Sequence, residues 1–209
     1  MRAVIFIMVL IFSGCSNKPV PQWQSSAKSY IKKMEYAKLA GFEKEAKIYK
    51  NSAIEQIKMS ASIAKLQILE LTDIALDVAL LKTADFSSYD RLEAIEFVAE
   101  NRAFRDFLAG QNTDISMLDS RYSSFAKDST LSSAKKIEDE LSRLIALAIL
   151  AKNDRENVEI YNSILEISKP NGYLAVSINT LSVLRAIYTK NQDIKNQREI
   201  ELLLEELKR

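Results

Sequence analysis

The chain has 209 residues, of which 29 are Lys or Arg, 28 are Asp or Glu and none is His. A nearly neutral chain lacks the basic surface that a general nucleic-acid-binding protein needs, so nucleic acid is not an expected partner. Without histidine the chain has neither the commonest general base nor the commonest metal ligand. The composition therefore disfavours an enzyme and predicts no cofactor.

An apolar segment opens the chain. Residues 3–12 (AVIFIMVLIF) contain no polar side chain and follow Arg2, which is the charge order of a secretory signal peptide. A helix of this length rises about 15 Å, roughly half of a bilayer core. We therefore predict that residues 1–14 are a signal peptide and not a permanent span.

Two small residues, Ser13 and Gly14, precede Cys15, the only cysteine of the chain. The stretch resembles the lipobox of bacterial lipoproteins over residues 1–15, with Phe12 where that family usually has Leu. The resemblance implies that Cys15 is the lipid attachment site and anchors the mature chain in a membrane. By the same resemblance, Ser16 favours the periplasmic face of the outer membrane over the inner membrane. The alternative is an ordinary signal peptide that is cut elsewhere and leaves Cys15 free.

The next segment, residues 15–26, lacks a helical period and contains two prolines, so we predict a tether. Trp23 either lies at the lipid interface or caps the first helix, and we favour the cap. Cleavage after residue 14 removes one basic residue, Arg2, and no acidic one, so the mature chain would carry 28 of each sign.

Residues 27–209 have apolar side chains spaced by three and four, with only four Gly and three Pro in the whole chain. This pattern predicts one all-α domain of long helices with short connections. The expected helices span residues 26–40 (ended by Gly41), 42–59, 63–81, 87 or 88 to 110, 114–125, 132–152, 154–168, 173–189 and 193–208.

The segment 63–81 is apolar at 13 of its 19 positions, which predicts the central buried helix of the domain. Its acids Glu70, Asp73 and Asp77 recur at three and four, so we expect one narrow stripe facing water. Four charges in this segment argue against a membrane span. The stripe Ile200, Leu203, Leu204 and Leu207 predicts that the last helix packs on its predecessors.

Two expected hairpins resemble tetratricopeptide repeats, which are helix pairs with small or apolar residues at fixed spacings. In the first, Gly41 stands in the turn and is followed by Ala46 and Ala53. In the second, Ile145, Ala146 and Ile149 precede Asn153, and Val158, Leu165 and Pro170 follow it. The resemblance implies antiparallel helical hairpins, arranged either as a tetratricopeptide-like repeat array or as a compact helical bundle.

Charge is unevenly distributed along the chain. Residues 28–65 hold nine lysines and four glutamates, whereas residues 138–166 hold seven acids and three bases. The first segment is either a basic face for anionic lipid or peptidoglycan, or one of two ordinary solvated faces. We favour the second interpretation.

The sequence gives only weak evidence for catalytic groups. Ser–Lys pairs with the spacing of penicillin-binding enzymes occur at chance frequency, and that family's Lys-Thr-Gly motif is absent. Acidic runs such as Glu138–Glu140 and Glu205–Glu206 are typical of solvated helix surfaces. We predict no catalytic, cofactor-binding or metal-binding residue. The four Ser–Lys pairs with that spacing are Ser25 with Lys28, Ser29 with Lys32, Ser62 with Lys65, and Ser132 with Lys135.

The anchor and the helical body together favour a non-enzymatic lipoprotein of the cell envelope that binds another envelope protein as an interaction or assembly factor. The alternative hypothesis is a carrier or chaperone for an apolar ligand in the periplasm, with a cavity around residues 63–81.

Overall fold

The computed structural model describes residues 21–207, which contain eleven helices and no strand. The predicted all-α fold is confirmed. The helices are α1 (Gln22–Ala40), α2 (Glu43–Lys58), α3 (Ile63–Ala79), α4 (Ser87–Glu93), α5 (Ala99–Ala109), α6 (Ser120–Asp128), α7 (Leu131–Lys135), α8 (Glu140–Asn153), α9 (Val158–Ser168), α10 (Leu174–Lys190) and α11 (Ile194–Leu207).

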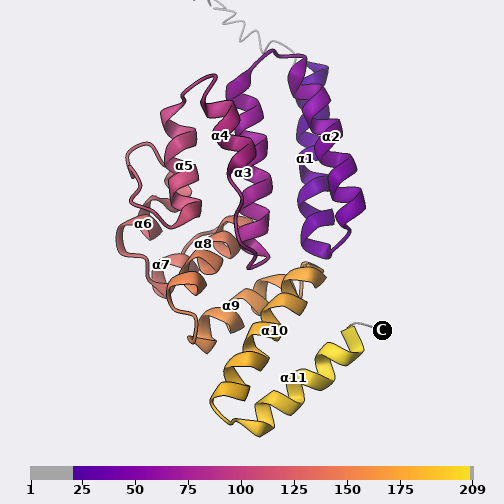
Figure 1. The fold of residues 1–209 in the computed structure, drawn as a ribbon, viewed down its shortest axis with the longest axis vertical. Helices are drawn as coiled ribbons and strands as arrows, with labels where there is room; N and C mark the ends of the chain where they lie inside the picture. The colour runs from indigo at the N-terminus through magenta and orange to yellow at the C-terminus, as the bar shows by residue number, and fades with distance from the viewer. Residues whose placement is uncertain (1–20, 208–209) are drawn as a thin grey trace, which may run out of the picture.

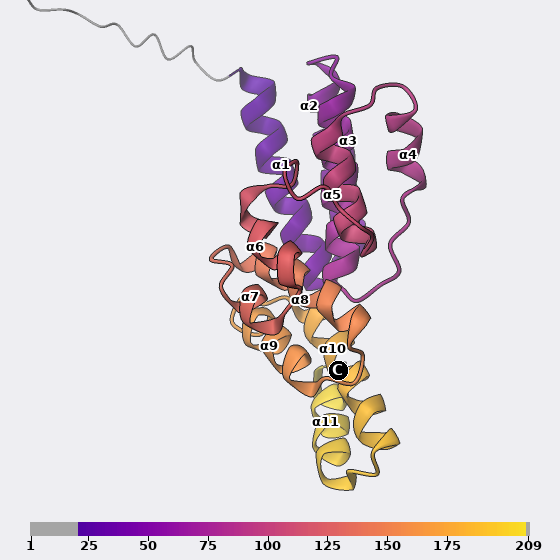
Figure 2. The same ribbon diagram turned by 90° about the vertical axis from the view of Figure 1, so that its left-hand side faces the viewer.

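The molecule is an elongated stack of helices (Figure 1). Helices α1, α2 and α3 pack side by side at one end, and α4 and α5 pack on α3. Helix α8 packs on α3 and α9, and the hairpin of α10 and α11 forms the opposite end (Figure 2). The described chain thus starts at one end of the stack and finishes toward the other.

Helix α3 is the centre of the α1–α5 half, as its apolar sequence predicts. Leu69, Leu71, Leu76 and Val78 expose 1% or less of their surface. Ser62 caps the helix by accepting a hydrogen bond from the backbone N–H of Lys65. Ser62 therefore has a structural role.

The first hairpin follows the predicted pattern. Gly41 ends α1 with φ +95°, the left-handed conformation that a glycine adopts without strain. Ala46 and Ala53 are buried on the face of α2 toward its neighbours. The second predicted hairpin is present as α8 and α9, in which Ile145, Ala146 and Ile149 are buried.

Helix α1 begins at Gln22, inside the predicted tether, so residues 22–26 are helical. Trp23 therefore lies in the first turn of the helix, where the Lys65 ammonium lies 4.6 Å from the centre of its ring. Cys15 and the remainder of the signal and anchor prediction lie outside the described residues.

The helix predicted from residue 87 to 110 is instead two helices, α4 and α5. The buried side chain of Gln67 lies at this break, where its amide donates hydrogen bonds to the carbonyls of Leu92 (3.3 Å) and Glu96 (2.6 Å). Asn101 in turn donates to the Gln67 carbonyl at 2.8 Å. The carbonyl of Leu92 also accepts from the backbone N–H groups of Ile95 and Glu96, whereas the carbonyl of Glu96 lies in the connection and is satisfied by Gln67.

Two further predicted helices differ from the structure, one because it is divided and one because it begins later. The helix predicted at 132–152 is divided into α7 and α8, because Asp139 caps α8 through the N–H of Ser142 at 2.8 Å. The helix predicted from Asp114 is α6, which starts only at Ser120 after its own cap, Asp119. Asp114 caps a turn at Ser116 instead.

The C-terminal helix packs on α10 through half of its predicted stripe. Ile200 and Leu204 are buried, whereas Leu203 and Leu207 keep 43% and 39% of their surface exposed. The difference arises because α11 lies at the end of the stack and has only α10 as a principal neighbour.

Candidate functional site

The acidic stripe of α3 is only partly exposed and is paired with lysines from two other helices, so the prediction of a stripe facing water was wrong. Lys38 of α1 and Lys50 of α2 lie over it and form what we call the charge network, with Glu70, Asp73 and Asp77. The Lys38 ammonium lies 2.5 Å from Asp73 and 2.9 Å from Asp77. The Lys50 ammonium lies 2.8 Å from Glu70 and 2.7 Å from Asp73.

Each charged group of the charge network has a partner of opposite charge within the network. Burial opposes ionisation of Asp73, but Lys38 and Lys50 outweigh it and lower the pKa of the carboxyl below its usual value. Burial also disfavours the charge of Lys50, yet its bonds to Asp73 and Glu70 raise the pKa of the ammonium. With each charge partnered inside the chain, the network holds the α1–α2 hairpin on α3.

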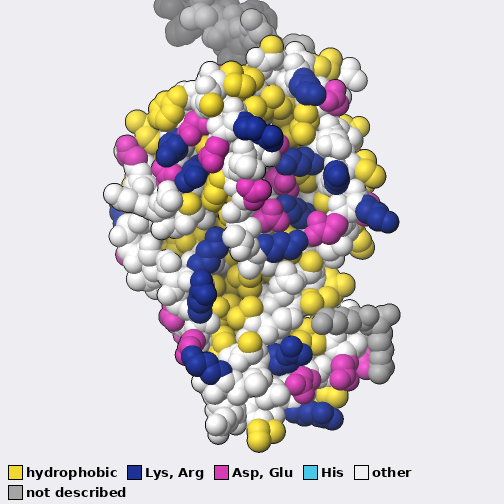
Figure 3. Space-filling model, in the orientation of Figure 1, with side chains coloured by type: hydrophobic (Ala, Val, Ile, Leu, Met, Phe, Trp, Pro, Cys, Tyr) yellow, Lys and Arg dark blue, Asp and Glu magenta, His cyan; other side chains and the backbone are white. Residues whose placement is uncertain are grey.

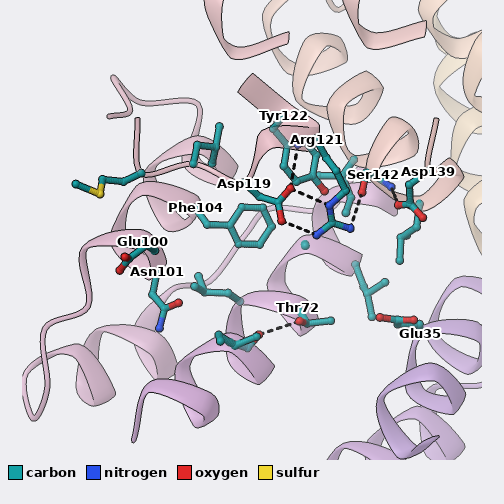
Figure 4. A pocket seen from close by; sticks show the side chains of 18 residues that line it. Glu35, Thr72, Glu100, Asn101, Phe104, Asp119, Arg121, Tyr122, Asp139 and Ser142 are labelled. Carbon is teal, nitrogen blue, oxygen red and sulfur yellow. Dashed lines mark hydrogen bonds and ion pairs between the residues drawn. The ribbon is translucent and has the colours of Figure 1, made fainter. Parts of the chain in front are cut away.

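On another flank of α3 lies an open pocket of about 450 Å³ bounded by α1, α3, α5, α6 and α8, which we call the central pocket (Figure 4). Its volume lies within the range of small-molecule and side-chain binding sites. The apolar part of its lining consists of Ile68, Leu71, Ala75, Leu76, Phe104, Met117, Leu118, Leu141 and Ile145.

An aromatic cluster fixes the wall of the pocket that α5 and α6 form. The ring of Tyr122 lies 5.7 Å from that of Phe104 and 4.8 Å from that of Phe107. Phe125 meets Phe107 edge-on at 6.0 Å. Such packing stabilises the contact between the two helices beyond the burial of area alone, so the wall is preformed.

Arg121 projects across the pocket between Asp119 and Ser142 (Figure 4). Its Nε and Nη2 donate to the two oxygens of Asp119 at 2.9 and 3.0 Å, and its Nη1 donates to the Ser142 hydroxyl at 3.4 Å. This fork geometry holds the guanidinium in one orientation. The bond to Arg121 also lowers the pKa of Asp119, so the pair neutralises itself.

Three other carboxylates line the pocket without such a partner: Glu35, Glu100 and Asp139. Within residues 21–207, no Lys or Arg forms an ion pair with any of them. Burial and then the charge of Asp139 raise the pKa of Glu35, and Lys32 only partly offsets this. The side of the pocket near Glu35 and Asp139 therefore carries negative charge that Lys32, Arg121 and the N-terminus of α8 offset only in part.

Two hydroxyl groups of the pocket, those of Tyr122 and Thr72, are poorly suited to acid–base chemistry at neutral pH. Burial raises the pKa of Tyr122 to about 12, so its hydroxyl stays protonated. Thr72 donates its hydroxyl to the carbonyl of Ile68 at 2.8 Å. The arrangement instead suits an apolar group on the floor and a cation beside Glu35 and Asp139.

Sequence reasoning placed Asp139 among solvated acids and assigned no role to Glu35, Asp119 or Arg121. The structure brings these four residues together from three parts of the chain: α1, the start of α6 and the cap of α8. The only local signal was that Asp139 precedes an apolar helix by one residue, which is typical of an N-cap. Glu138 lines a neighbouring pocket that shares Arg121 and Asp139 with the central pocket, and Glu205 and Glu206 lie in α11.

In the described part of the chain, no three His, Cys, Asp or Glu side chains are arranged to hold a metal ion. No helix between residues 21 and 207 is both long enough and apolar enough to cross a membrane.

Comparison of the chain with protein-family models, with curated proteins and with solved structures finds no match.

Proposed function

We propose that this protein is a lipid-anchored envelope protein that binds another envelope protein non-enzymatically through the central pocket. The observation that carries the proposal is the combination of an apolar floor with the carboxylates Glu35 and Asp139, which form no ion pair within the described residues. Such a pocket is complementary to a segment that presents an apolar side chain next to a Lys or Arg.

Three features support a binding role. The pocket is open, its aromatic wall is preformed, and Ile68 and Met117 at the pocket keep 52% and 42% of their surface exposed. Partly exposed large apolar side chains next to charged groups are typical of the centre and rim of protein interfaces. The lack of histidine in the sequence supports the non-enzymatic part of the proposal.

The anchor is proposed at Cys15, at the periplasmic face of the outer membrane, from the lipobox pattern. Helix α1 starts at Gln22, seven residues after Cys15. At no more than about 3.5 Å per residue, this stretch spans at most about 25 Å. A partner would therefore meet the protein close to the membrane surface.

Site-specific photo-crosslinking in intact envelopes tests the binding surface. A photoreactive residue at Ile68 should capture a specific protein, whereas one at Ile48, which is 61% exposed on α2 outside the pocket, should not. Glu35→Lys should abolish the Ile68 product by repelling the cation of the partner. Equal capture from both positions, or a product that survives Glu35→Lys, would contradict the proposal.

Metabolic labelling with a fatty acid tests the anchor separately. Labelled wild-type protein and unlabelled Cys15→Ala are expected, because the thiol is the proposed acceptor. Label retained in Cys15→Ala would refute the attachment site without bearing on the pocket.

A further inference from the structure

A second open pocket, of about 570 Å³, lies where the end of α3 meets α5, α8, α9 and α10. We call it the lower pocket. Figure 3 shows hydrophobic side chains in a hollow on this side of the molecule, with Lys and Arg beside it. Its lining is Leu81, Lys82, Thr83, Ala84, Phe86, Ala109, Ala151, Lys152, Arg155, Tyr161 and Val183.

The charged groups of the lower pocket are all basic. Lys82 is paired with Glu43 at 2.8 Å. The half-buried Lys152 has only a long bond of 3.5 Å to the carbonyl of Leu108, and burial lowers the pKa of its ammonium. Arg155 bonds only to a backbone carbonyl, that of Lys152, at 3.4 Å. Lys152 and Arg155 therefore lack a carboxylate partner within the described chain.

Contacts from neighbouring helices hold this pocket in shape. Asn179 of α10 donates to the carbonyl of Leu80 at 2.8 Å, and the Tyr161 hydroxyl donates to the carbonyl of Arg155 at 3.0 Å. The Arg105 guanidinium lies 4.5 Å from the centre of the Phe86 ring. A ligand would meet a surface that is already organised, which lowers the entropic cost of binding.

We propose that the lower pocket binds a small amphiphilic anion, a carboxylate or phosphate monoester on a short apolar chain. The head group would lie against Lys152 and Arg155, and the chain would lie on Ala84, Phe86 and Val183. The pocket size suits one such molecule. This inference does not depend on the proposed function, because it concerns other residues and a ligand of opposite charge.

Isothermal titration calorimetry of the full chain in phosphatidylcholine nanodiscs, with empty nanodiscs subtracted, tests the inference. Octanoate and octyl phosphate separate the two head groups, and octanol and octylammonium serve as neutral and cationic controls. At least one anion should bind about tenfold or more tightly than both controls, as a charge-assisted contact requires. Equal affinity for octanol, or no binding of either anion, would overturn the proposal.

Variants of the protein test whether the heat of binding measured by calorimetry arises at the lower pocket. Lys152→Met should weaken binding of the anion by about tenfold, and Thr83→Trp, at an exposed position, should block the pocket without disturbing the core. Lys127→Met, on an exposed part of α6, is the matched control and should change nothing. Anion binding that persists in both Lys152→Met and Thr83→Trp would place the ligand elsewhere and refute the assignment.

Discussion

The charge network and the central pocket lie beside the same two helices, α1 and α3, yet their carboxylates are in opposite states. In the network, Asp73 lies between two lysines and its pKa is lowered. In the pocket, Glu35 is partly buried beside Asp139 and its pKa is raised. The chain thus supplies lysine partners to the carboxylates of the charge network and forms no ion pair with Glu35 or Asp139 in the described residues, which is why we propose a structural role for the first region and a binding role for the second.

The opposite pKa shifts of Asp73 and Glu35 follow from the balance between the cost of burying a charge and the gain from pairing it. Removing a carboxylate from water disfavours its charged form, and nearby cations recover that free energy only at short distance. Asp73 has two ammonium groups within 2.7 Å, whereas no ion pair is formed by Glu35 within the described residues. Removing a carboxylate should therefore lower the free energy of unfolding in the charge network and raise it in the central pocket.

Asp73→Ala should have the largest effect. It leaves Lys50 with one partner and the buried Lys38 with only Asp77. We expect a loss of about 2–3 kcal/mol in the free energy of unfolding, less than for a fully buried pair because Asp73 keeps 21% of its side chain exposed. Urea unfolding followed by circular dichroism measures this. Glu199→Ala, on an exposed part of α11, should change stability by no more than about 0.5 kcal/mol.

Lowering the pH should remove the stabilisation of the fold that the charged Asp73 provides. Because the folded-state pKa is lowered, the stabilisation is complete above the unfolded pKa of about 3.9 and is lost as pH falls through the folded value. Unfolding midpoints of wild type and Asp73→Asn should therefore differ at pH 7 and converge below about pH 4. A gap that stays constant down to pH 2.5 would contradict the ion-pair explanation.

Glu35→Gln should act in the opposite direction and more weakly. A carboxyl with a raised folded-state pKa destabilises the fold as pH rises from the unfolded pKa through the folded value. The variant should be more stable than wild type at pH 7 by about 0.5 kcal/mol and indistinguishable near pH 3. It should also reduce crosslinking from Ile68. The exposed Glu100→Gln is the control for stability, and a Glu35→Gln variant less stable at pH 7 would refute this account of Glu35.

The smallest effect is expected at a fully solvated pair. Lys58 and Glu55 are 2.8 Å apart but keep 58% and 68% of their side chains exposed. Lys58→Met should change the free energy of unfolding by about 0.5 kcal/mol or less. A larger loss would show that short distance alone, and not enclosure, makes the charge network stabilising.

Local sequence was enough to predict the helices and several of their ends. The spacing of apolar residues predicts the all-α fold, and Gly41 and Gly110 end their helices in the left-handed conformation. Ser62 caps α3 three residues before the N–H that it binds. These signals are predictable because the interacting groups lie within one helical turn of each other in the chain.

Tertiary structure alone decided where helices break and which charges meet. Gln67 bonds to a carbonyl 25 residues away, beside the break between α4 and α5, and Lys38 lies 35 residues from Asp73. Glu35 and Asp139 reach one pocket from α1 and from the cap of α8. No local pattern encodes such pairs, because the free energy of a partly buried charge depends on which distant helix packs beside it. The sequence by itself determined the all-α fold, and only the packing of the helices separated an acidic stripe paired with lysines from an open acidic pocket.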